Sequence, residues 1–161
     1  MGVTDPETTM NKNDTPRDSG LFDLSTILAE PRATFPPRWA EIVPVDPFER
    51  AKVNEWLFWE QYSHEPYIAV RRFQKAYLGK RDEELDPKLL ANGRRALGQM
   101  ELQLRKTAFI AGEKLTVADI ALVAYTRAAP EGGFDLEEFP SVRQWIARVE
   151  RGLNIGESEA A

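Results

Sequence analysis

Few side chains in this sequence are suited to acid–base chemistry. His64 is the only histidine, and there is no cysteine. The imidazole ring has an ordinary pKa near neutrality, so His64 is the first candidate for hydrogen bonding a substrate. The alternative interpretation is an ordinary polar residue placed before Pro66. We favour that alternative, because no neighbouring residue in the sequence supplies a partner that would orient the ring.

The same composition excludes several kinds of site. Without cysteine the chain has no disulfide, no thiolate metal ligand and no cysteine nucleophile. One histidine cannot build a multi-histidine zinc centre. We therefore predict no metal site, and no residue is assigned as catalytic.

Three aromatic residues near His64 are candidates for a substrate pocket. Trp59, Tyr62 and Tyr67 would line it together with His64. Aromatic side chains at helical spacing also fill cores and dimer interfaces, and this is the interpretation we favour.

Three basic residues, Arg71, Arg72 and Lys75, follow the aromatic residues. Clustered cations can bind an anion, but a solvated helix face is the interpretation we favour here.

Thr116 and Asp119 have the spacing of a helix N-terminal capping box. The Thr116 hydroxyl is expected to accept from the Asp119 N–H, and the Asp119 carboxylate to accept from the Thr116 N–H. The carboxylate would also lie at the positive end of the helix dipole. A catalytic role for Asp119 is the alternative, which we disfavour because capping already accounts for the residue.

Hydrophobic spacing predicts about five helices to position these residues. Asp46-Pro47 and Asp86-Pro87 each combine a capping aspartate with a proline suited to the first helical turn. A kink or restart is expected at Pro66, because proline has no N–H to donate. Gly93 and Gly98 lie on or near the apolar stripe of the helix after Asp86, where they would permit a close approach. We predict an all-α fold, an orthogonal bundle of about five helices.

Composition divides the chain into four parts. Residues 1–20 are polar, so we expect a disordered arm. Residues 21–45 are predicted to hold a short amphipathic helix and a proline-rich connector, residues 46–154 the helical domain, and residues 155–161 a flexible tail.

Length and charge restrict the class of protein. The chain has 161 residues and a formal net charge of −5, which predicts one domain and disfavours a nucleic-acid binder that needs a basic face. We find no signal peptide and no apolar run long enough to cross a bilayer. We therefore expect a cytoplasmic protein with no membrane partner.

Three segments carry a resemblance to a known family. Residues 109–121 read FIAGEKLTVADIA, which is similar to the run of glycine, hydrophobic residue, Ser or Thr, and Ala-Asp that starts the buried central helix in the C-terminal helical domain of bacterial cytosolic glutathione transferases. Residues 139–145 (FPSVRQW) are similar to the next helix, and residues 56–69 (WLFWEQYSHEPYIA) look like the first helix of that domain. The resemblance covers about residues 44–153, in the order of the family.

The resemblance implies a transferase that lacks most of the thioredoxin-like N-terminal domain. In the family that domain binds glutathione and supplies the Ser, Tyr or Cys that stabilises its thiolate. Residues 18–30 resemble the last helix of that domain, with a longer spacing than in the family, which implies Ser19 as a glutathione-binding residue. Glutathione is the cofactor that the resemblance implies, and no other is assigned.

The resemblance leads to three functional hypotheses. In the first, the helical domain of a glutathione S-transferase-like protein supplies the pocket for a small hydrophobic electrophile and is not catalytically competent alone. In the second, it is a non-catalytic interaction or dimerisation module. In the third, it is a truncated product without activity. The expected protein partner is a second copy, as a homodimer, or another protein.

Overall fold

The computed structural model describes residues 42–155, and this part of the chain is helical, with a single isolated β-bridge between Phe109 and Gly112. Its α-helices are α4 (Pro47–Trp59), α5 (Glu65–Arg72), α6 (Pro87–Leu104), α7 (Val117–Thr126) and α8 (Pro140–Leu153). The all-α prediction is confirmed for the described residues. The predicted arm, most of the connector, Ser19 and the tail beyond Ile155 lie outside them.

Short helical turns join these helices. Two are π-helical, η1 (Glu60–His64) and η2 (Phe73–Tyr77), and three are 3₁₀ turns, η3 (Asp82–Glu84), η4 (Ala129–Gly132) and η5 (Leu136–Glu138). The segments α4, η1, α5 and η2 follow one another without a gap, so they form one long helical rod.

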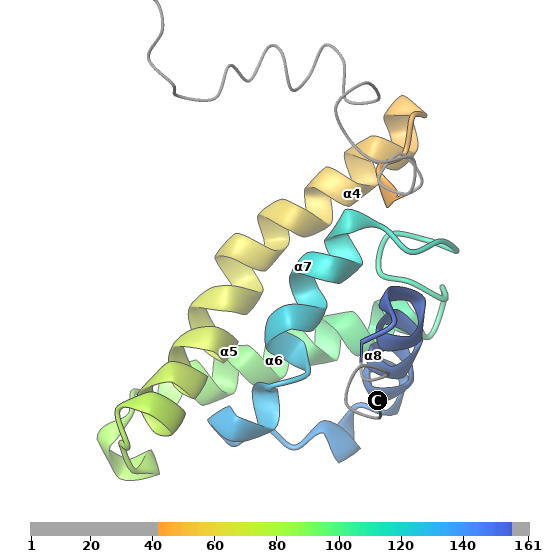
Figure 1. Cartoon of the computed structure of the whole chain (residues 1–161). Coiled ribbons are helices and arrows are strands. Elements are labelled where there is room, and N and C mark those ends of the chain that lie inside the picture. The colour runs from red at the N-terminus through yellow and green to blue at the C-terminus, as the bar shows by residue number, and fades with distance from the viewer. Residues whose placement is uncertain (1–41, 156–161) are drawn as a thin grey trace, which may run out of the picture. The chain divides into compact units, whose positions relative to one another are not determined.

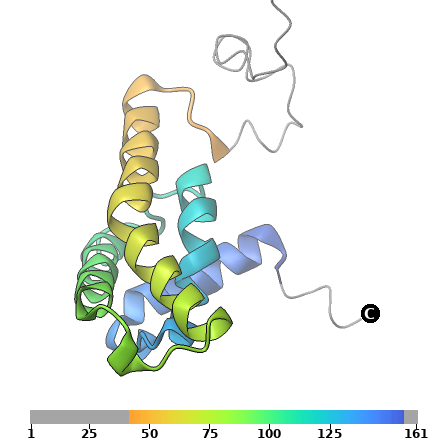
Figure 2. The same cartoon turned by 90° about the vertical axis from the view of Figure 1, so that its left-hand side faces the viewer.

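The remaining helices pack around this rod. In Figures 1 and 2, α7 lies beside α4, and α6 lies beside α5. Helix α8 packs against both α6 and α7. A buried cluster of apolar side chains lies between the helices, and its largest fully buried members include Trp145, Ile68, Leu97, Met100, Ile110 and Leu122.

Two of the predicted helix starts use aspartate as the cap. Asp46 Oδ1 accepts from the N–H groups of Phe48 and Glu49, both at 3.0 Å. Asp86 Oδ1 accepts from the Lys88 N–H at 2.9 Å. These bonds satisfy amide donors that have no partner inside the helix, which is why α4 and α6 begin at these positions.

The interruption expected at Pro66 is a widened turn within a continuous rod. The Glu65 N–H donates to the Glu60 carbonyl, five residues earlier, and Pro66 lies in the first turn of α5. Proline cannot donate, and its ring crowds the carbonyl four residues before it. The π turn accommodates one more residue in the turn and so relieves this conflict without ending the rod.

Gly93 provides the close approach that the sequence suggested, but to a side chain of a loop. A Cβ atom built on Gly93 would lie 2.4 Å from Cε1 of the buried Phe134, which follows η4. The same atom built on Gly98 would meet nothing within 4 Å. The expectation for Gly98 is therefore wrong, because that part of α6 has no neighbour close enough to require a glycine.

These two glycines give a matched test of the packing. Gly93→Ala should destabilise the chain by about 1–3 kcal/mol, because the new methyl group must displace the Phe134 ring. Gly98→Ala should stabilise it by up to ~1 kcal/mol, since alanine is the better helix former and the space is open. Urea denaturation of both variants measures the difference. Equal stability of the two would contradict the packing of Phe134 on α6.

Candidate functional site

Asp119 lies in the first turn of α7 and is fully buried. Its Oδ2 accepts from the backbone N–H and from the hydroxyl of Thr116, both at 2.9 Å. Its Oδ1 accepts from the Ile110 N–H and from the Trp145 indole N–H, both at 2.8 Å. A carboxylate offers about four acceptor positions, and here each has a donor. Asp119 therefore ties the loop at Ile110, the start of α7 and the middle of α8 together.

The start of α8 is capped by a residue that the sequence analysis did not single out. The buried Glu101 of α6 accepts through Oε2 from the N–H groups of Ser141 at 2.9 Å and Val142 at 3.1 Å. Its Oε1 accepts from Arg105 Nε at 3.1 Å. Burial alone would raise the pKa of Glu101, but these hydrogen bonds outweigh it and hold the pKa below its usual value. No short-range pattern marks this cap, because its donors lie 40 and 41 residues away.

The four candidate pocket residues all lie on the rod, but they face in different directions. Tyr62 is 80% exposed, whereas His64, only two residues later in the same π turn, has no exposed surface. Trp59 is half-buried, donates from its indole to Gln99 Oε1 at 3.0 Å, and meets the edge of Trp56. Tyr67 is half-buried in α5. The structure brings Trp59 and His64 together, with 5.9 Å between ring centroids, and leaves Tyr62 on the outside.

His64 is a core residue in this structure. Its Nε2 lies 2.9 Å from the Thr126 hydroxyl near the end of α7. Burial lowers the pKa of His64 to about 4, so the ring is neutral at pH 7. A side chain without exposed surface cannot contact a substrate unless the rod moves away from α7.

The basic residues of α5 and η2 are paired, and Arg71 is not on a solvated face. Arg71 is 3% exposed, donates to the Gly132 carbonyl at 2.8 Å and pairs with Asp82. Lys75 also pairs with Asp82, at 2.7 Å. The predicted solvated face is therefore wrong for Arg71, because its guanidinium is buried against Asp82 of η3 and Gly132 of η4. This pairing also leaves its guanidinium committed to partners within the chain.

Arg72 pairs with Glu131 at 2.7 Å. Each of the three predicted basic residues thus has an acidic partner among the described residues. The arrangement joins α5 to η3 and η4 and offers no ready anion site.

A hollow of about 640 Å³ lies elsewhere, between the end of α7, the η4–η5 segment and α8. None of the four candidate residues on the rod lines it. Its wall combines apolar side chains with paired charges, namely Arg127, Pro130, Phe134, Asp135, Leu136, Glu137, Arg143, Ile146, Ala147 and Glu150.

Residues 42–155 contain neither a candidate metal cluster nor a candidate membrane-spanning helix. No group of three or more His, Asp or Glu side chains in this range is placed to hold a metal ion. None of the helices described there combines the length and the apolar character needed to span a bilayer.

Comparison with known proteins assigns this bundle to a family. Residues 56–151 match the family described as "Glutathione S-transferase, C-terminal domain". This match covers more than half of the chain, and the chain belongs to the glutathione S-transferase family. The resemblance inferred from the three sequence segments is thereby confirmed.

Individual relatives agree with this assignment. Glutathione S-transferase D7 of Drosophila melanogaster is 30% identical over 105 residues, which are 65% of this chain and 46% of the relative. A glutathione S-transferase structure from Pseudomonas fluorescens is 48% identical with a TM-score of 0.66, over 68% of this chain and 56% of that one. Another from Xanthobacter autotrophicus is 40% identical with a TM-score of 0.65, over 78% and 60%. The chain thus spans about half the length of the relatives it matches.

The four hydrogen bonds to Asp119 predict that even Asp119→Asn lowers the unfolding free energy strongly. Asp119→Asn replaces one acceptor oxygen with an NH₂ group that faces donors, so we expect a loss of roughly 3 kcal/mol in unfolding free energy. Asp135→Asn is the matched control, because Asp135 only caps η5 from an exposed position and asparagine caps equally well. Chemical denaturation compares the two, and a loss below about 1 kcal/mol for Asp119→Asn would contradict the junction.

Glu101 predicts a pH-dependent contribution to stability. Because its folded pKa lies below the unfolded value, the contribution is present above the unfolded pKa of 4.5 and is lost as the pH falls through the folded pKa. Glu101→Gln should therefore cost about 1–2 kcal/mol at pH 7 and less at pH 3. Glu137→Gln, on an exposed ion pair with Arg143, should cost at most ~0.5 kcal/mol. Denaturation at both pH values checks this, and a cost for Glu101→Gln that does not change with pH would argue against the assigned cap.

Proposed function

We propose that this chain acts as the electrophile-binding part of a glutathione-dependent transferase. The observation that supports this most directly is the exposed aromatic surface of Phe58 and Tyr62, which are 68% and 80% exposed. They are four residues apart, so they share one side of the rod where α4 passes into η1. Trp59 is half-buried next to them. Phe58 is not among the candidates predicted from the sequence, although its four-residue spacing to Tyr62 is the signal that would have found it.

The chemistry of this surface suits a planar, apolar electrophile. Large exposed apolar side chains that lie together mark binding surfaces more often than they mark solvent-facing positions. Aromatic rings attract other rings in stacked or edge-on geometry, and the tyrosine hydroxyl adds one polar contact. Tyr62, Trp59 and Tyr67 are the contacts that we propose, and His64 supports them from the core.

The thiolate is proposed to come from glutathione bound outside residues 42–155. In the reaction, the glutathione sulfur forms a bond to an electrophilic carbon, and the leaving group departs with the electron pair of the broken bond. Two side chains in the bundle with chemistry suited to activating a thiol are engaged, because Asp119 has a donor at each acceptor position and His64 is buried. We therefore propose that the helical part is not catalytically competent alone. Since glutathione is abundant in the cytosol, the proposal places the protein in the cytoplasm.

A second candidate function is a non-catalytic interaction or dimerisation module. A second exposed apolar group, Phe73, Tyr77 and Leu78, lies at the C-terminal end of the rod, and each member is more than half exposed. The Phe73 and Tyr77 rings are stacked at 5.7 Å. A preformed exposed aromatic pair of this kind suits a protein partner or a second copy.

Exposed tyrosines at the middle and at the C-terminal end of the rod separate these functions. Tyr62→Ala should weaken binding of a chlorodinitrobenzene probe by about five-fold, which corresponds to the loss of one ring contact. Tyr77→Ala is the matched control, since Tyr77 is 64% exposed but lies at the far end, and it should leave probe binding unchanged. Equilibrium binding to the full chain measures both. Equal effects, or none, would contradict the proposed pocket.

Two further measurements on the full chain separate the transferase role from the interaction module. One is retention of the chain on immobilised glutathione, and the other is its mass in solution by light scattering. Retention with conjugation by the chain alone would contradict our proposal that it needs a separate thiolate-stabilising part. No probe binding together with a dimer that Tyr77→Ala dissociates would favour the interaction module.

A further inference from the structure

The hydrogen bond between His64 and Thr126 determines which imidazole nitrogen carries the proton. The Thr126 hydroxyl lies 2.7 Å from the Leu122 carbonyl, and a carbonyl can only accept, so the hydroxyl donates there. Its oxygen, 2.9 Å from His64 Nε2, must then accept from an Nε2–H group. The ring is neutral with its proton on Nε2, and Nδ1 carries a lone pair.

His64 Nδ1 is buried and has no hydrogen-bond partner among the described protein atoms. A proton added there would create a buried cation whose new N–H group has no acceptor. Thr126 cannot respond, because its single hydroxyl proton is already donated to Leu122. The site is therefore arranged to hold the neutral ring and to reject the charged one.

We infer that the contact between η1 and the end of α7 is an acid-released latch, closed by neutral His64 on Thr126 and opened when the ring takes up a proton. Opening relieves the buried charge by turning the imidazole toward water. This breaks its bond to Thr126 and exposes the Trp59 ring, whose centroid lies 5.9 Å from that of His64. The π turn is suited to such a movement, because its wider ring of backbone bonds is a local departure from the regular helix.

The shift in the pKa of His64 has burial as its sole cause, which agrees with this geometry. The titratable groups next to it along the rod are Glu60, in the same π turn, and Glu65, the first residue of α5. Burial raises the pKa of Glu60, and the charge of Glu65 raises it further. Glu60 therefore opposes the His64 effect, because an acid with a raised folded pKa gains stability as the pH falls.

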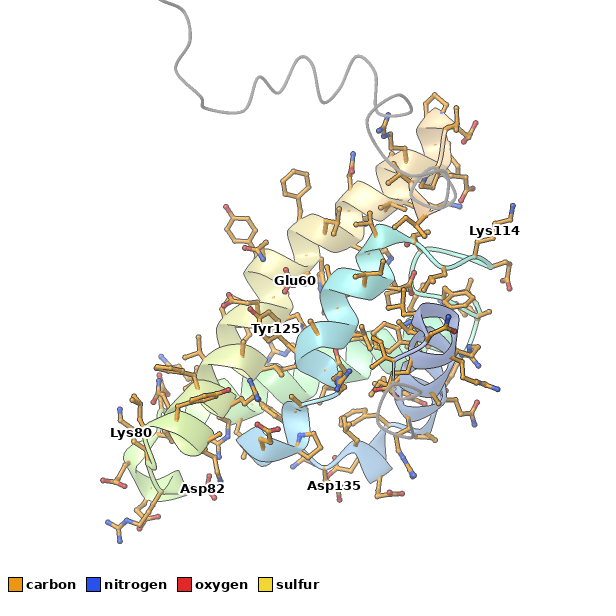
Figure 3. All side chains as sticks on the ribbon, in the orientation of Figure 1. Glu60, Lys80, Asp82, Lys114, Tyr125 and Asp135 are labelled. Carbon is orange, nitrogen blue, oxygen red and sulfur yellow. The ribbon has the colours of Figure 1, made fainter. Side chains whose placement is uncertain are left out.

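The helices packed against η1 add few charges. On α7 the residues beside Thr126 are Tyr125 and Arg127, and Arg127 lies 3.6 Å from Glu150 of α8. On α6 the contact to Trp59 is the neutral Gln99. Figure 3 shows Glu60 and Tyr125 in the region where the rod faces α7. None of these groups is a cause of the shift at His64, so burial of the ring alone lowers its pKa.

The sign and size of the effect follow from linkage. The folded pKa is about 4 and the ordinary value is 6.5, so the unfolded chain binds more protons between these pH values. Stability is unaffected above this window and falls as the pH drops through it. The equilibrium constant for unfolding should rise by roughly 30-fold at pH 5 and by roughly 150-fold at pH 4 through His64 alone.

Because His64 is the only histidine, its titration can be followed in the full wild-type chain without a variant. We expect NMR of the imidazole to show the Nε2–H tautomer at pH 7 and no protonation of the folded form down to about pH 5. Titration of the folded chain near pH 6.5, or an Nδ1–H tautomer, would overturn the inference.

The matched variant is His64→Gln, which places an amide donor near Thr126 and does not titrate. Urea denaturation at several pH values should show the extra 30-fold loss at pH 5 in the wild type relative to this variant. The opposite slope of Glu60 cancels in that comparison. Identical pH dependence of the two proteins would overturn the latch.

Hydrogen exchange separates local opening from general acid destabilisation. Wild type and His64→Gln are compared at the same pH 5, so that intrinsic exchange rates cancel. Amides of η1 and of the end of α7 should lose protection in the wild type, while those near Asp119 and Trp145 keep theirs. A loss spread evenly over α4 to α8 would contradict a latch, since it would mean that acid acts on the whole bundle.

Discussion

The buried carboxylate of Asp119 is the constraint on which the arrangement of the C-terminal helices depends. It accepts four hydrogen bonds, from two groups of Thr116, from the Ile110 amide and from the Trp145 indole. A buried charge without these donors would be costly, so the carboxylate is stable only when the loop at Ile110, the start of α7 and the middle of α8 all pack around it. The start of α7 is thereby fixed at the centre of the bundle.

A second buried carboxylate, that of Glu101, holds the start of α8. Glu101 of α6 caps the amides that open α8, so α8 is held by Asp119 through Trp145 and by Glu101 at its beginning. The rod from α4 to η2 is fixed differently, by apolar packing, by the neutral contact of His64 with Thr126, and by the buried Arg71. Ionic junctions thus fix α8, while the rod meets the end of α7 through an uncharged bond that pH can change.

The two proposed roles use different parts of the rod. The rod carries exposed aromatic groups at two places along its length, one containing Tyr62 and the other Tyr77. The proposed transferase role uses the first group and the alternative role as an interaction module uses the second. In either proposed role, the polar groups buried in the bundle serve to position the helices.

Local patterns in the sequence determined the helices and the family. Asp46, Asp86 and Thr116 mark helix starts because each capping hydrogen bond joins two residues at most three positions apart. The bundle class followed from such starts and from the apolar spacing between them.

Only the tertiary structure decided which way Tyr62 and His64 face, because a π turn changes the spacing on which a helical pattern relies. It also decided the partners of Asp119, Glu101 and Arg71, since Trp145, Ser141 and Gly132 lie 26, 40 and 61 residues away. Hydrogen bonds over such separations depend on how the helices pack, and no short segment of sequence contains both ends of the bond.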